Sequence, residues 1–138
     1  MNKNIVTVAT ALRLIPCERV IRFFQKGVCG IIQYTGKINI PINIPGTLMI
    51  SATQTGGIIK KEVTWEEQQP SAELLNNLEL YKTQKYVALY KDQWGFMRLC
   101  GNMEHPLTFQ YNMTGETLKI SLNGEDTRPD LYTTVLKN

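Results

Sequence analysis

The chain has 138 residues, of which 43% are hydrophobic and 20% are charged, and its formal net charge is +3. These values are typical of one globular domain and exclude a disordered chain and a strongly basic nucleic-acid binder. No apolar run approaches the roughly 20 residues that cross a bilayer, and the N-terminus lacks a signal-peptide core. We therefore expect a single soluble domain over residues 1–138, made and kept in a cytoplasm.

Short apolar segments with turn signals between them are typical of β-strands in a sandwich or barrel. In the N-terminal part, Pro16 ends the first such segment, a Lys-Gly pair at residues 26–27 separates the next two, and two glycines at residues 56–57 allow a tight hairpin turn. A last short segment follows a polar turn near the C-terminus. Strands are expected at residues 11–15, 20–25, 29–34, 47–53, 58–65 and 131–136.

The segment 37–45 has a strict period of two, with isoleucines on one side and Lys, Asn and Pro on the other. Pro41 cannot donate to a strand ladder, so the segment is expected either as an edge strand over its own core or as an extended arm that lies on a neighbouring subunit. In the second case the isoleucines form a protein interface. They are Ile38, Ile40, Ile42 and Ile44.

One helix is predicted at about residues 71–81, with Ser71 as its N-cap and leucines at helical spacing. A β-meander is expected over residues 85–122, because the segments 86–90 and 96–100 flank a short polar loop and apolar and polar residues alternate strictly in 107–111 and 118–122. Its first two strands flank a short loop that ends in Gly95, with Trp94 at the tip. The shared core of helix and meander is expected to contain Leu74, Leu75, Leu78, Phe109, Tyr111, Leu118, Ile120 and Leu122.

Residues suited to catalysis or metal binding are sparse. His105 is the single histidine, the three cysteines lack CxxC spacing, and no phosphate-binding or dinucleotide-binding glycine loop is present. We expect reduced and mostly buried thiols, a solvated strand around the Lys pair at residues 60–61, and a solvated acidic turn at 124–130. The sequence thus predicts no enzyme, no cofactor, no metal site and no small-molecule substrate.

A series of short motifs runs through the second half of the chain. They are SAELL at 71–75, KYVALYKDQWG at 85–95, LCGN at 99–102, HPL at 105–107 and SLNGE at 121–125. With these motifs, residues 71–127 resemble small uncharacterised proteins of Bacteroidetes phages and prophages, although a Leu-Asn pair at residues 122–123 replaces the aromatic strand end of those proteins. The resemblance implies a structural component of a phage tail or neck, located in the virion and, during assembly, in the host cytoplasm.

Two functions follow as hypotheses. The first is a non-enzymatic virion protein that contacts itself and other phage structural proteins, with the isoleucine segment in the contact. The second is a small monomeric binding module, or an inhibitor directed at the host, that uses a patch around Trp94. In both cases the expected fold is mainly β (α+β), an antiparallel β-sandwich or barrel with one short α-helix before a C-terminal β-meander. Specific recognition of nucleic acid is not expected.

Overall fold

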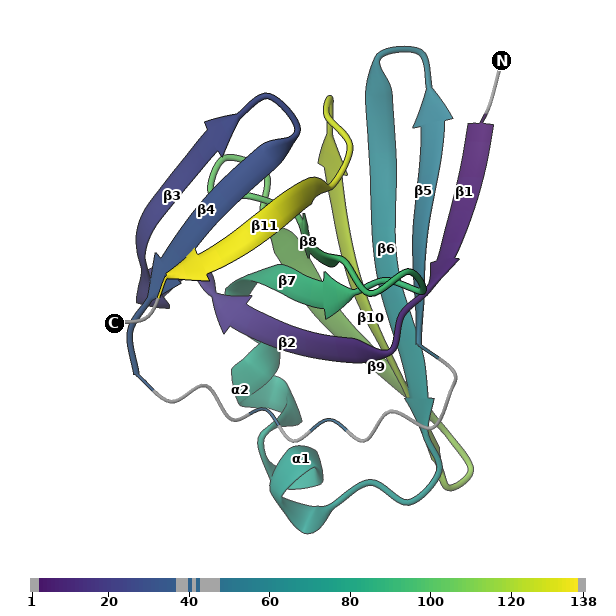
Figure 1. The fold of residues 1–138 in the computed structure, drawn as a ribbon. Helices are drawn as coiled ribbons and strands as arrows, with labels where there is room; N and C mark the ends of the chain where they lie inside the picture. The colour runs from purple at the N-terminus through teal and green to yellow at the C-terminus, as the bar shows by residue number, and fades with distance from the viewer. Residues whose placement is uncertain (1–2, 37–39, 41, 43–47, 137–138) are drawn as a thin grey trace.

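A computed structural model describes residues 3–36, 40, 42 and 48–136 of the chain. Eleven strands in this part form one sheet that is not closed, with two short helices beneath it (Figure 1). The mainly β, α+β class expected from the sequence is confirmed. The strands are β1 (Lys3–Val8), β2 (Ala11–Pro16), β3 (Val20–Lys26), β4 (Cys29–Tyr34), β5 (Met49–Thr55), β6 (Ile58–Glu67), β7 (Lys85–Lys91), β8 (Met97–Cys100), β9 (Leu107–Thr114), β10 (Thr117–Asp126) and β11 (Leu131–Leu136).

The strand order is β1-β5-β6-β10-β9-β7-β8-β11-β4-β3. Strand β2 lies off this path and pairs with the edge of β7 that faces away from β8 and β9. Strands β1 and β3 end this path and lie on opposite sides of the molecule (Figure 1). The hairpins β3–β4 and β5–β6 follow the sequence-based expectation. Two features do not: β1 was not anticipated, and β11 runs parallel to β4.

The expected meander is only partly correct. Strands β7 and β8 form a hairpin, as do β9 and β10, but β9 pairs with the start of β7 rather than with β8. The loop after β8 turns back at Gly101, which has a φ of 82°. Asn102 then holds the loop, because its side-chain oxygen accepts hydrogen bonds from the backbone N–H groups of Glu104 and His105 at 2.9 and 2.8 Å. The chain therefore returns to the sheet along the same edge of β7 that pairs with β8.

Strand β7 separates two hydrophobic cores. Alternate side chains point to opposite faces of a strand, so Tyr86, Ala88 and Tyr90 belong to the larger core, while Val87 and Leu89 belong to the smaller one. All five are buried. The larger core also holds Trp65, Leu107, Phe109, Leu118, Ile120 and Leu122, and the smaller core holds Ile15, Ile32, Leu99 and Leu131.

The expected helix is present as two short pieces, α1 (Ala72–Asn76) and α2 (Leu78–Lys82). Ser71 caps α1, because its hydroxyl oxygen accepts a hydrogen bond from the backbone N–H of Leu74 at 3.2 Å. Asn77 interrupts the helix. Leu74 and Leu78 are buried in the larger core as expected, whereas Leu75 is 41% exposed and does not join it. A short 3-10 turn, η1 (Cys17–Arg19), connects β2 to β3.

Candidate functional site

The isoleucine segment can be placed in part. Ile40 and Ile42 are partly buried and pack against the larger core of their own chain. Ile38 and Ile44 lie outside the described residues. A neighbouring subunit is therefore not needed to cover Ile40 and Ile42, and the contact of this segment with a partner stays a prediction.

The loop between β7 and β8 is held by Asp92, which is only 2% exposed. One of its carboxylate oxygens accepts hydrogen bonds from the backbone N–H groups of Trp94 and Phe96, at 3.0 and 2.9 Å. The Trp94 side chain is 69% exposed. Phe96 stacks edge-on against Tyr132 of β11, with ring centroids 5.6 Å apart. The loop thus presents aromatic side chains to solvent from a fixed backbone.

The two ends of the sheet carry exposed apolar side chains. On β1, Ile5, Val6 and Val8 are 50, 52 and 49% exposed, and on β3, Ile21 and Phe24 are 50 and 57% exposed. Neither strand has a second strand partner among the described residues. Backbone N–H and C=O groups on such an edge are free to pair with another chain.

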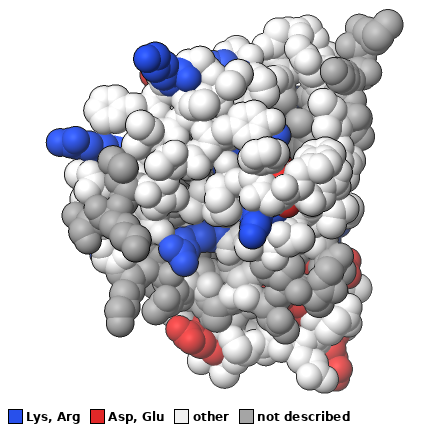
Figure 2. All heavy atoms as spheres, in the orientation of Figure 1, with Lys and Arg blue, Asp and Glu red and all other residues white. Residues whose placement is uncertain are grey.

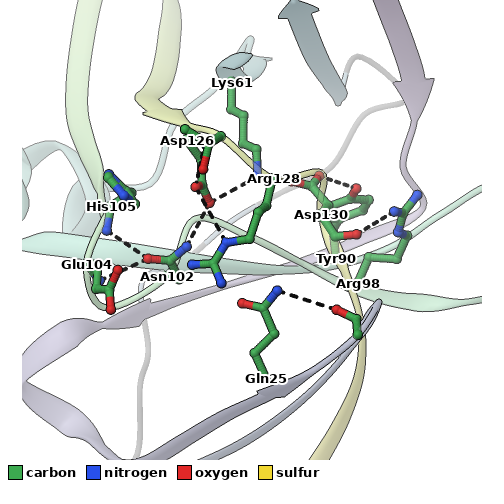
Figure 3. Close-up of polar contacts among 12 residues, drawn as sticks. Gln25, Lys61, Tyr90, Arg98, Asn102, Glu104, His105, Asp126, Arg128 and Asp130 are labelled. Carbon is green, nitrogen blue, oxygen red and sulfur yellow. Dashed lines mark hydrogen bonds and ion pairs between the residues drawn. The ribbon is translucent and has the colours of Figure 1, made fainter. Parts of the chain in front are cut away.

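A buried ionic cluster lies where the end of β10 and the start of β11 meet β6 (Figure 3). The Lys61 side chain from β6 is 4% exposed, and its ammonium nitrogen lies 2.9 Å from an Asp130 carboxylate oxygen and 3.8 Å from one of Asp126. Arg128 adds a looser contact, with Nε 3.9 Å from Asp126. Burying charges is costly unless they are paired and hydrogen-bonded, so the rest of the cluster must satisfy these oxygens.

Neighbouring polar groups satisfy part of them, while Asp130 Oδ1 has its ion pair with Lys61 and accepts no hydrogen bond among the described residues. Tyr90 donates its hydroxyl to Asp130 at 2.5 Å, and the Asn102 amide donates to Asp126 at 2.7 Å. Arg98 donates from Nη2 to the backbone carbonyl of Asp130 at 2.6 Å. Burial and the adjacent Asp130 carboxylate raise the pKa of Tyr90 far above its ordinary value of 10.0, and burial raises the pKa of the Cys100 thiol above 9.0. Both groups therefore stay protonated at neutral pH.

A cavity of about 360 Å³ opens beside this cluster. One wall is apolar and comes from β1, β5 and β6, and the other is polar and comes from β6, β7, β8 and the segment before β11. A second, larger hollow of about 610 Å³ lies over β5, β6, β9 and β10, and its lining is mainly polar. The smaller cavity is lined by Ile5, Thr7, Ile50, Ala52, Gln54, Ile59, Lys61, Tyr90, Arg98, Thr127, Pro129 and Asp130.

The sequence-based interpretation of the charged residues was wrong at three positions. Lys61 was placed on a solvated strand, although its phase on β6 is that of the buried Val63 and Trp65. Asp126 was placed in a solvated turn, although it lies on β10 in phase with its buried apolar residues and is 4% exposed. The Asp130 side chain, expected in the same turn, is 10% exposed. The alternation within 58–65 already puts Lys61 in phase with Ile59 and Val63, and extending the alternation of 118–122 by four residues would have indicated Asp126.

Other candidate groups are dispersed. His105 is exposed, Cys17 is half-buried and Cys29 is exposed, so the expectation of mostly buried thiols fits Cys100 alone. Within the described part of the chain no three His, Cys, Asp or Glu side chains gather as a metal site. On the face shown in Figure 2, the charged side chains are scattered among uncharged ones.

Comparison of the chain with protein-family models, curated proteins and solved structures gives no match. Among the residues that the structure describes, no helix has the length and apolar character needed to cross a membrane.

Proposed function

We propose that the protein is a non-enzymatic structural subunit that assembles with copies of itself by pairing the β1 edge of one copy with the β3 edge of the next. The observation that carries the proposal is the open sheet, whose two end strands both expose apolar side chains and lack a second strand partner among the described residues. Joining them extends one sheet across two copies. The resemblance to phage proteins supports a tail or neck as the setting.

Strand β1 has few of the features that usually protect a sheet edge. Apart from Lys3 at its start it includes no charge and no proline, and it has no bulge in its pairing with β5. Strand β3 is of matching length, seven residues against six, although it includes Arg22 and Lys26 and has a register shift near its start. Because the two edges lie on opposite sides of the molecule, their contact is heterologous, and such contacts close into rings or run on as tubes. A phage tail or neck has this geometry.

The test uses one lysine substitution on each edge. Val6→Lys and Phe24→Lys each place a charge in one half of the proposed contact, so each variant alone should be a monomer by light scattering, whereas the wild type is larger. A mixture of the two should form only dimers, because one intact β1 edge and one intact β3 edge remain. Val28→Lys is the matched control, since Val28 is 64% exposed but lies in the turn after β3.

Two outcomes would contradict the proposal. If Phe24→Lys still forms dimers on its own, the contact is between two β1 edges and cannot build a ring. If Val6→Lys and Phe24→Lys have the same mass as the wild type, as the control Val28→Lys should, the edges are not the contact. Circular dichroism of each variant confirms that the sheet is intact.

The loop between β7 and β8 supports a second candidate function. The loop with Trp94 is rigidly held by Asp92 and displays an exposed indole, and large aromatic side chains on a fixed backbone are typical of binding surfaces. This favours the monomeric binding module. The two functions are separated by mass, because the module requires a monomer of 15.7 kDa and the structural subunit does not.

A further inference from the structure

The cavity beside the ionic cluster combines two chemically different walls. Ile50 and Ile59 are 4 and 8% exposed, so the apolar wall is part of the folded core rather than a loose surface. Lys61 lies beside them on the same face of the β5–β6 pair, and Arg98 and Asp130 complete the polar lining. Cavities of roughly 300 to 1,000 Å³ with an apolar body and a few polar groups are typical of small-molecule sites.

The polar wall has an excess of positive charge. Its charged residues are the cations Lys61 and Arg98 and the anion Asp130, which leaves one positive charge. Lys61 is paired with the carboxylates of Asp130 and Asp126. The cation that remains without a carboxylate partner among the described residues is Arg98.

Arg98 uses little of its hydrogen-bonding capacity. A guanidinium has five N–H donors, and among the described residues only Nη2 donates a hydrogen bond, to the carbonyl of Asp130. Its Nε is enclosed and lacks a partner there. The guanidinium also stacks on the ring of Tyr132, 4.5 Å from the centroid, which holds the group in place. Because Nε is enclosed, a ligand in the cavity would be bound by the other N–H groups of the guanidinium. Asp130 Oδ1, from the same lining, likewise accepts no hydrogen bond among the described residues and has Lys61 as its ion-pair partner.

We propose that this cavity binds a small monocarboxylate with an aliphatic chain, its carboxylate on Arg98 and its chain against Ile50, Ala52 and Ile59. A carboxylate supplies the missing charge and the acceptor oxygens that a guanidinium prefers. The apolar wall explains why the ligand needs a chain. This site is independent of the edge contact, and it departs from the sequence-based expectation that no small molecule is bound.

The experiment is a calorimetric titration with octanoate, compared with acetate, octanol and octylamine. Acetate lacks the chain, octanol lacks the charge and octylamine reverses it. The wild type should bind one octanoate per chain and bind each of the other three at least about tenfold more weakly, since a charge-assisted hydrogen bond or a buried chain of this length is worth that much.

Variants locate the ligand. Arg98→Gln should weaken octanoate binding about tenfold or more, whereas Arg128→Gln, which removes the same charge from a side chain outside the cavity, should change it by less than about threefold. Ala52→Phe, which fills the apolar wall of the cavity, should abolish binding. Because Ala52 lies opposite Lys61 in the β5–β6 ladder, an unchanged urea midpoint of this variant must show that the ionic cluster is intact. Ala52→Phe keeps the test decisive if Arg98→Gln does not fold.

Several results would overturn the proposal. One is the absence of saturable octanoate binding to the wild type. Others are equal binding of octanol or octylamine, a folded Arg98→Gln variant that binds as the wild type does, or undiminished binding by Ala52→Phe. Because none of these variants lies on the outer edge of β1 or β3, failure here leaves the test of assembly unaffected.

Discussion

Strand β7 lies inside the sheet, whereas strand β1 lies at one end of it. Strand β7 pairs on both edges and buries both faces, so each of its residues from Tyr86 to Tyr90 belongs to a core. Strand β1 pairs on one edge and leaves Ile5, Val6 and Val8 about half exposed. Burial of apolar side chains is thus concentrated at the centre of the sheet, where we expect most of the hydrophobic stabilisation, while β1 leaves apolar surface in water. Substitutions at the centre and at the ends should therefore change different measured quantities.

The largest effect is expected for Lys61→Met in the interior of the sheet. Removing the ammonium group leaves the carboxylates of Asp126 and Asp130 buried without their cation, which typically costs about 3 to 5 kcal/mol in the free energy of unfolding. Urea denaturation measures this. If the midpoint stays at the wild-type value, the cluster is hydrated rather than buried.

Ile120→Ala should follow, with a loss of about 2 to 5 kcal/mol, because Ile120 is fully buried in the larger core and the smaller side chain leaves a cavity. Leu75→Ala is the control, since Leu75 is 41% exposed. It should cost less than about 1 kcal/mol. Equal losses for the two variants would contradict the assignment of the buried faces.

Tyr90→Phe should cost about 1.5 to 3 kcal/mol at neutral pH, because it removes a hydrogen bond to the Asp130 carboxylate. The pKa of Tyr90 is raised in the folded state, so its contribution is complete below pH 10.0, the ordinary value, and is lost as pH rises above it. The wild type should therefore lose about 1.4 kcal/mol per pH unit more than the variant there. Parallel pH profiles of the two proteins would refute this.

Trp94→Ala should have the smallest effect. The side chain is 69% exposed, and the loop is held by Asp92 through backbone N–H groups that the substitution retains. Stability should change by no more than about 0.5 kcal/mol, and the assembled mass should not change. A variant that falls to monomers would move the contact from the sheet edge to this loop.

Local features of the fold could be predicted from the sequence, whereas long-range ones could not. Strict alternation predicted β9 and β10, and Ser71 with its leucines predicted the helix, because these signals lie within a few neighbouring residues. The return of β9 to β7 and the parallel pairing of β11 with β4 depend on contacts between distant segments, about which alternation carries no information. The ionic cluster also depends on contacts between distant segments, since it combines four separate parts of the chain. They contribute Lys61, Tyr90, Asn102 and Asp130.

Residue-level hydrogen exchange of β1 tests the edge contact most directly. In an antiparallel pair, alternate residues of an edge strand point their N–H groups away from the neighbouring strand. If β1 pairs with a second copy, these outward amides should become protected as protein concentration rises, while those bonded to β5 stay protected throughout. Rapid exchange of the outward β1 amides at every concentration, together with a mass in solution that stays at the 15.7 kDa of one chain, would contradict assembly through this edge.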